Sequence, residues 1–411
     1  MTLSSYRGCA TAREARRRAA LVINRTRMVC RRDLISFQTA CYPIELQRSA
    51  KRSRCSHEVS EEGVESVTIS RRRFIAGIGV AASSTCALGG WDRIAAAAVH
   101  PWLNLSKDDR TRARPSKVSG DRISSTFRIS VISDEIAQDF GRACEVAARE
   151  FGMEWVELRD LWNKNVLNLD SNEIAEARRI LQKYRLRVTD IASPLFKVDW
   201  PGAPQSKYSQ RDEFKAGFTF NQQDEVLERA LRAAAGFGTD RVRCFDFWRL
   251  QDQKPYRALI NDRLREAARK AGKKGITLLL ENEESCNTST GAEAAKVLEA
   301  VKSPYLMLNW DPANAAACGE KPYPDGYNLL PKERIGHCHC KDTVKRGTEY
   351  EWEAMGRGIV DWVGQFKALK RDGYHSAVSL ETHWEGGGTA EQSSRTSWSG
   401  MKKILQEADA L

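Results

Sequence analysis

ITLLLENE at residues 276–283 is an apolar run that ends in acidic residues, and three later segments repeat this design. They are LMLNWDPAN (306–314), IGHCHCKD (335–342) and AVSLETHW (377–384). Their polar end residues Glu281, Asp311, His339 and Glu381 are separated by 30, 28 and 42 positions. One strand-loop-helix unit of an eight-unit βα barrel has about this length. The sequence therefore predicts parallel strands whose carboxyl ends bring these four side chains to one point.

Short β-like runs alternate with helical patterns from Phe127 onward, and several of the runs are continuously apolar, as buried parallel strands are. The predicted strands are FRISVI (127–132), MEWVEL (153–158), LRVTDIA (186–192), DRVRCFDF (240–247), ITLLLE (276–281), YLMLNWD (305–311), RIGHCHC (334–340) and SAVSLET (376–382). This alternation predicts an α/β fold, a (β/α)8 TIM barrel forming a single domain over residues 127–411. The long interval at 193–221 is the predicted lid.

The chemistry of the four end residues indicates a metal site. Three carboxylates that meet beside an imidazole would repel one another unless a cation lay between them. Strand alternation puts His337 and His339 on one face and Cys338 and Cys340 on the other, which argues against a Cys2His2 zinc site. Oxygen-rich coordination with one imidazole favours a single divalent ion of Mn, Mg or Co.

The local strings LLLEN, NWDPAN, HCHCKD and SLETHW, with MGRGIVDW at 355–362, resemble the xylose isomerase-like TIM barrel family, also called sugar phosphate isomerase/epimerases. The resemblance covers about residues 127–411. It implies that Glu281, Asp311, His339 and Glu381 bind one divalent ion. It also implies that Glu281 and Glu381 are catalytic and move protons through a metal-stabilised enediolate. Because no Gly-rich phosphate loop stands out, we expect a metal-dependent isomerase or epimerase of a free sugar or a related polyol-ketone.

Three positions depart from the ketose 3-epimerase branch of that family. Glu283 and Asn314 stand where histidines are expected, and Lys345 stands where an arginine is expected. Two alternatives therefore stay open: a lyase or dehydratase that acts on a keto-inositol or 3-keto-glycoside through the same site, and a non-catalytic sugar-binding protein.

Further polar and aromatic residues at strand ends are candidate substrate contacts. A tryptophan in a barrel is more often part of the packing, and a lysine at a strand end is equally typical of the surface. The predicted substrate-binding residues are Glu157, Trp248, Arg249, Glu283, Asn314, Lys341 and His383.

The formal net charge of +11 is concentrated at the start of the chain, where residues 1–73 carry +9 of it. The remaining 338 residues are almost neutral, so the composition argues against nucleic-acid binding. A homo-oligomer is compatible with the sequence, which does not fix the number of subunits.

SRRRFI (70–75), followed by a short apolar stretch rich in Ala and Gly, resembles a twin-arginine export signal with Arg71 and Arg72 as its arginine pair. We expect residues 70–98 to be this signal peptide and residues 99–126 to be a linker. The basic, irregular leader at 1–69 indicates either a start codon assigned too early or a long leader. Twin-arginine export machinery is then a partner, and the location is periplasmic or extracellular.

Overall fold

The computed structural model describes residues 122–207 and 217–411. The predicted leader (1–69), the predicted signal peptide (70–98) with Arg71 and Arg72, and most of the predicted linker (99–126) lie outside the described residues. Within the described ranges, no helix combines the length and the apolar character that crossing a bilayer requires.

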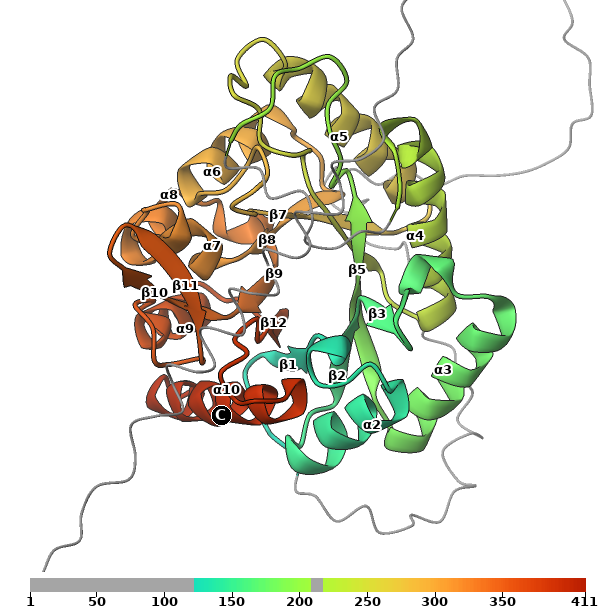
Figure 1. Ribbon diagram of the computed structural model, residues 1–411, viewed down its shortest axis with the longest axis vertical. Helices are drawn as coiled ribbons and strands as arrows, with labels where there is room; N and C mark the ends of the chain where they lie inside the picture. Colours follow the sequence, from blue (N-terminus) through green and yellow to red (C-terminus); the bar gives the residue numbers. More distant parts are fainter. Residues whose placement is uncertain (1–121, 208–216) are drawn as a thin grey trace, which may run out of the picture. The chain divides into compact units, whose positions relative to one another are not determined.

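Eight parallel strands form one sheet in the order β1-β12-β9-β8-β7-β6-β5-β2 (Figure 1). A parallel bridge between Ile132 and Glu157 links the two outer strands, so the sheet is a nearly closed barrel. The predicted (β/α)8 fold is confirmed. The strands are β1 (Arg128–Val131), β2 (Trp155–Leu158), β5 (Arg187–Leu195), β6 (Arg241–Cys244), β7 (Thr277–Glu281), β8 (Leu306–Trp310), β9 (Ile335–Cys340) and β12 (Ala377–Leu380).

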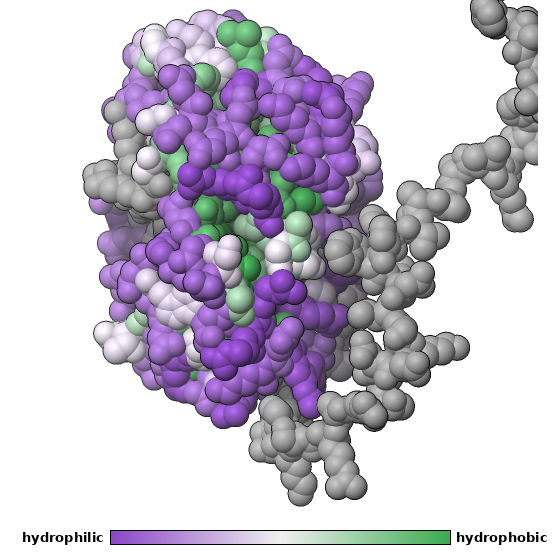
Figure 2. All heavy atoms as spheres, turned by 90° about the vertical axis from the view of Figure 1, so that its right-hand side faces the viewer, coloured by the Kyte–Doolittle hydropathy of each residue, from purple (hydrophilic) through white to green (hydrophobic). Residues whose placement is uncertain are grey.

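Helices surround the strands in Figure 1, and their ends carry clear local signals. Asp170 and Glu173 form a capping box that starts α3, and Gly238, with φ of +73°, ends α4 in the left-handed region. Figure 2 shows a mainly hydrophilic face with hydrophobic residues gathered near its middle. The helices are α2 (Phe140–Glu145), α3 (Ser171–Tyr184), α4 (Gln223–Phe237), α5 (Arg257–Gly272), α6 (Gly291–Ala300), α7 (Pro312–Ala317), α8 (Tyr327–Leu329), α9 (Trp362–Arg371) and α10 (Ala390–Glu407).

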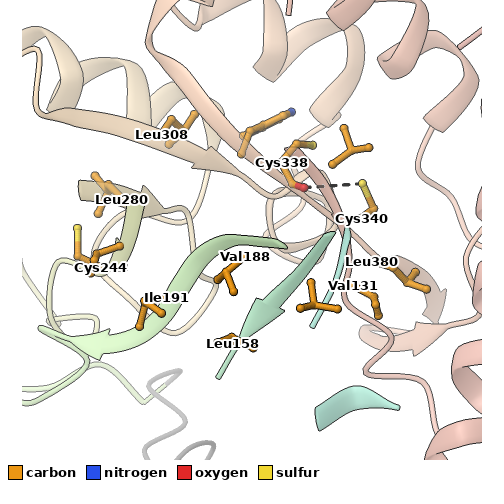
Figure 3. Packing of buried hydrophobic residues seen from close by; sticks show 14 of the residues in the cluster. Val131, Leu158, Val188, Ile191, Cys244, Leu280, Leu308, Cys338, Cys340 and Leu380 are labelled. Carbon is orange, nitrogen blue, oxygen red and sulfur yellow. Dashed lines mark hydrogen bonds between the residues drawn. The ribbon is translucent and has the colours of Figure 1, made fainter. Parts of the chain in front are cut away.

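Side chains on the barrel strands alternate between an apolar outer layer and a polar interior. The outer set packs in the main core, as Figure 3 shows for Leu280, Cys338 and Cys340. In contrast, His337 of β9 contacts Glu157 of β2, and these two strands are not neighbours in the sheet. Such a contact requires both side chains to lie inside the barrel, where each is 0% exposed.

Two short antiparallel hairpins were not predicted. One consists of β3 (Asp160–Leu161) and β4 (Lys164–Asn165), and the other of β10 (Asp342–Arg346) and β11 (Glu349–Glu353). Both lie after barrel strands, at the end where the candidate residues gather. Two-residue strands leave almost no periodic signal, and the second hairpin is mostly polar, so neither resembles a buried strand.

The predicted lid at 193–221 is described only in part. β5 continues to Leu195, three residues beyond the predicted strand, because this stretch pairs with β6. Trp200 then packs its ring against Phe220 at 5.4 Å and Phe247 at 4.8 Å. Residues 208–216 lie outside the described part of the chain, and the lid stays a prediction.

Candidate metal centre and active site

Four acidic and imidazole side chains meet at the carboxyl end of the barrel, as their spacing predicts. Glu281 is the last residue of β7, Asp311 directly follows β8, His339 lies in β9 and Glu381 directly follows β12. One possible ligand atom from each lies within 4.8 Å of the others, and all four residues are buried. Parallel strands produce this convergence because their carboxyl ends share one face of the barrel.

Asp311 is held in place by the start of helix α7. Its Oδ1 accepts a hydrogen bond from the Asn314 backbone N–H at 2.9 Å, as an N-cap does, and Pro312 opens the helix. The Asn282 side chain clamps the Asp311 backbone by accepting from its N–H at 2.8 Å and donating to its carbonyl at 2.7 Å. One carboxylate oxygen, Oδ2, is thereby left to face the cluster.

His339 is oriented from behind by Glu157. Its Nε2 lies 3.0 Å from Glu157 Oε1, and its Nδ1 lies 2.9 Å from Glu281 Oε1 and 3.2 Å from Glu381 Oε2. A hydrogen bond to Glu157 fixes Nε2–H and directs Nδ1 toward the cluster. Glu157 was predicted to bind substrate, but it is fully buried and also bonds His337 Nε2 at 3.1 Å, so it acts on the histidines instead.

Three cationic side chains neutralise the carboxylates. Lys341 Nζ lies 2.8 Å from Asp311 Oδ2 and 2.7 Å from Glu381 Oε2, so this lysine lies in the cluster, and its predicted contact with substrate stays a prediction. Arg243 of β6 reaches Glu281 Oε2 at 3.2 Å, and Arg159 reaches Glu381 Oε1 at 3.7 Å. We did not predict either arginine. The sequence did offer a signal for both, because Arg243 lies inside the short strand RVRC and Arg159 directly follows the strand WVEL.

The electrostatic environment separates the acidic groups. Burial alone raises the pKa of Glu281, but His339 and Arg243 outweigh it and lower this pKa to about 2. Burial, with the neighbouring Glu381, raises the pKa of Asp311 to about 6 despite Lys341. Burial opposes the charged form of His339, yet the surrounding carboxylates raise its pKa well above the ordinary value. The site thus favours positive charge at its centre.

The four residues fit a divalent cation. They offer three carboxylates and one imidazole nitrogen, the donor set that suits Mn, Mg or Co. Glu281 Oε2 and Asp311 Oδ2 are buried and accept no hydrogen bond, and they lie in ion pairs with Arg243 and Lys341. Glu281, Asp311, His339 and Glu381 would therefore hold the ion.

A cavity of about 800 Å³ opens beside Glu381. His383 lines it and lies with Nε2 3.2 Å from Glu381 Oε1, on the predicted side of the strand end. Trp352 of β11 also lines it, with its ring 5.6 Å from the His383 ring and 4.8 Å from Lys341 Nζ. Trp384 forms another part of the wall. Most of the residues that line the cavity are polar or charged, and Trp352 and Trp384 are its two aromatic residues, a combination that suits a polar small molecule.

Two predicted substrate contacts, Arg249 and Trp248, are instead engaged in internal hydrogen bonds or packing. Arg249 binds Glu293 at 2.8 Å and Ser289 Oγ at 2.9 Å, which ties the loop after β6 to helix α6. Trp248 is 6% exposed and packs in a small cluster with Phe245 and Cys286. Neither residue is among those that line the cavity beside Glu381.

Asn314 and Glu283 lie close to the cluster but also have internal partners. Asn314 Nδ2 donates to the Asn282 carbonyl at 2.9 Å, which braces the start of α7. Glu283 accepts from Ser285 Oγ at 3.0 Å and forms an ion pair with Lys197 at 3.4 Å. The strand-seven pair Glu281 and Glu283 therefore does not converge on one ligand position.

Solved structures share this fold at low sequence identity. The IOLI protein with a bound zinc atom is 16% identical with a TM-score of 0.54, covering 69% of this chain and 98% of that protein. The probable 3-DHS dehydratase AsbF from Bacillus anthracis is 20% identical with a TM-score of 0.50, covering 68% and 99%. A D-allulose 3-epimerase from Methylomonas sp. is 18% identical with a TM-score of 0.50, covering 70% and 99%.

One longer protein shares only part of its length with this chain. The matched part spans 43% of a xylose isomerase-like TIM barrel/4-hydroxyphenylpyruvate dioxygenase fusion protein. No curated protein matches the chain. The family model described as xylose isomerase-like TIM barrel matches residues 146–404, well over half of the sequence. The chain belongs to the xylose isomerase-like TIM barrel family.

Proposed function

We propose that this protein is a divalent-metal-dependent isomerase or epimerase of a free sugar or a related polyol-ketone. The observation that carries the proposal is the meeting of Glu281 and Glu381 beside His339 Nδ1, at 2.9 Å and 3.2 Å. Their strands, β7 and β12, are separated by β8 and β9 in the sheet, so the two carboxylates approach from different sides. Opposed carboxylates are what proton transfer between two faces of a substrate requires.

In this proposal one glutamate removes the proton next to the substrate carbonyl and the other returns a proton. Glu281, Asp311, His339 and Glu381 would hold a Mn, Mg or Co ion, which would supply positive charge that stabilises developing negative charge on the substrate. Glu281, whose pKa is lowered to about 2 by His339 and Arg243 against the effect of burial, is ionised, the form in which a carboxylate binds a divalent cation. Lys341 holds Glu381 in position through its ammonium group at 2.7 Å.

The cavity beside Glu381 suits a polar, ring-sized ligand. Its volume of about 800 Å³ exceeds the space that a monosaccharide needs. Trp352 and Trp384 supply apolar faces against which the C–H side of a sugar can pack. Glu135 and Arg159 add hydrogen-bonding groups for hydroxyls.

A lyase or dehydratase is the second candidate, and His383 is the observation that favours it. After the same proton removal, a group on the next carbon leaves and needs a proton. His383 lies in the cavity, 3.2 Å from Glu381. Burial opposes its charged form, but Glu381 raises its pKa above the ordinary value, so it can supply that proton. A keto-inositol or a 3-keto-glycoside would be the substrate.

The test is metal-dependent proton exchange. The protein loaded with Mn or Mg is incubated in D2O with ketoses, inososes and 3-keto-glycosides, and NMR follows loss of the carbon-bound α-proton. Exchange should occur on one substrate class and vanish in Glu281→Gln and Glu381→Gln. Glu407→Gln, an exposed change on α10, is the matched control and should keep full exchange. Absence of exchange on every compound, in protein shown to hold metal, would favour a sugar-binding role.

Export is a separate proposal that rests on sequence alone. We propose that Arg71 and Arg72 direct transport by the twin-arginine machinery to the periplasm or the exterior. Replacing both with Lys in the full chain should leave the protein in the cytoplasmic fraction. Arg73→Lys is the matched control, because the third arginine lies outside the expected pair. Equal export of both variants would contradict the proposal.

A further inference from the structure

A second, smaller cavity of about 240 Å³ lies next to the catalytic cluster and is lined by an excess of cationic groups. It shares Arg159 and Asp160 with the larger cavity, so the two cavities adjoin at these residues. Four cationic residues line it: Arg159, Lys164, Lys197 and Arg243. The acidic residue among its lining is Asp160, and amide side chains complete the wall.

The cations of this cavity are structurally fixed. Arg159 is 6% exposed, Arg243 is 5% exposed and Lys197 is 8% exposed, so three of the four are more than nine-tenths buried. Arg243 also donates to the backbone carbonyls of Ala192 at 3.2 Å and Ser193 at 3.5 Å, which holds its guanidinium. Lys164 is at the rim and enters from the β3–β4 hairpin.

The acidic partners of these cations lie outside the small cavity. Arg243 pairs with Glu281, Lys197 with Glu283 and Lys164 with Glu173, and none of these glutamates lines it. The cavity therefore faces the cationic side of each pair, and its field favours an anion. Planar guanidinium groups and amides are also the donors that bind carboxylates well.

The small cavity is coupled to the chemistry through its two arginines. Arg243 Nη1 lies 3.2 Å from Glu281 Oε2, and Arg159 Nη1 lies 3.7 Å from Glu381 Oε1. An anionic group held by Arg159 and Arg243 would thus lie within one small molecule's length of both proposed proton-transfer groups.

We propose that this cavity is a subsite for an anionic substituent of the substrate, so that the substrate is a sugar acid or another acidic polyol-ketone. The inference rests on the proposed function, because it assigns the substrate of the same site. The ligand chemistry is a carboxylate or a phosphate, both of which the four cations can bind. A neutral sugar would fill the large cavity and place no negative charge in the small one.

The test compares three probes of one size class on the full chain with Mn²⁺ present: glucose, glucuronate and glucose 6-phosphate, each titrated by calorimetry. We expect at least one anion to bind about tenfold more tightly than glucose, the effect of one added charge-assisted contact. Preference for glucuronate assigns a carboxylate, and preference for glucose 6-phosphate assigns a phosphate.

Lys164→Glu is the variant, because Lys164 lies at the rim with a side chain that is 42% exposed, and circular dichroism checks that the fold is kept. It should reduce the anion-to-glucose affinity ratio to near one. Lys270→Glu makes the same charge change on α5, where Lys270 pairs with Asp224 of α4 at the surface. This control should keep the wild-type ratio of anion affinity to glucose affinity. A wild-type ratio of one, or an equal ratio in both variants, overturns the proposal. Proton exchange is measured separately, so loss of the anion preference and loss of the proposed reaction are distinguishable.

Discussion

Replacing Glu157 with Gln should weaken metal binding without changing the fold. Glu157 lies behind the proposed ligand His339, and its two oxygens face His339 Nε2 at 3.0 Å and His337 Nε2 at 3.1 Å. Glutamine has nearly the same shape but no charge and only one acceptor oxygen. It therefore cannot fix both histidines as the carboxylate does, and His339 Nδ1 loses its fixed direction toward the cluster.

The size of the effect follows from these contacts. A hydrogen bond to a charged group contributes about 1.5–3 kcal/mol, whereas a neutral one contributes about 0.5–1.5 kcal/mol. Replacing the charged hydrogen bond to His339 with a neutral one should then cost about 1–2 kcal/mol of metal-binding free energy, or about 5- to 30-fold in Mn²⁺ affinity. This overlaps the lower part of the range of about 10- to 100-fold that is typical for changes behind a metal-ligating histidine.

Calorimetric titration of Mn²⁺ into the metal-free protein measures this loss. Glu154→Gln is the matched control, because Glu154 precedes the same strand and pairs with Arg122 and Arg187 at the surface. Both variants should show the same circular dichroism as the wild type. If Glu157→Gln bound Mn²⁺ as tightly as Glu154→Gln does, the orienting role of Glu157 would be refuted.

Three other outcomes are expected. Gly400→Ala should lower the free energy of unfolding by about 2 kcal/mol, because the added Cβ would collide with the Met355 carbonyl oxygen. Gly236→Ala on α4 is the control: its Cβ meets no close atom, so this change should be neutral or stabilising. Urea denaturation measures both. Mn²⁺ affinity should increase as the pH increases, by up to about tenfold per pH unit, as long as the pH is below the raised pKa of His339, because the imidazole must lose its proton before the cation binds. Titrations at several values from about pH 6 to about pH 8 measure this increase. Trp352→Ala should weaken substrate binding about tenfold while Trp352→Phe retains most of it, as KM would show; equal losses would contradict a stacking role.

The fold was predictable because the eight strands carry their signal locally. Runs such as ITLLLE are apolar enough to indicate buried parallel strands, and the intervals between them match one βα unit. The positions of Glu281, Asp311, His339 and Glu381 followed from the same argument, since parallel topology alone brings strand ends together.

The supporting residues were not predictable from the sequence in the same way. The contact between Glu157 and His339 crosses the barrel between strands that are far apart in sequence, so it exists only after the barrel closes. Arg249 shows the opposite case, a residue that was predicted to contact substrate but has internal partners instead. It follows a strand at the expected place, but Glu293 and Ser289 are near enough to bind it, and this depends on how the loop after β7 folds.

Folding and chemistry use alternate residues of the same strands. In β9, Cys338 and Cys340 pack in the apolar core, while His337 and His339 face the polar interior. The buried acids of the cluster already have cationic partners in Lys341, Arg243 and Arg159, so no carboxylate of the four-residue cluster depends on a metal for all of its compensation. Burying an uncompensated charge costs several kcal/mol, whereas a paired charge is tolerated. The outer layer can therefore stabilise the barrel before any cation binds, and the inner layer is left free to specialise for a substrate.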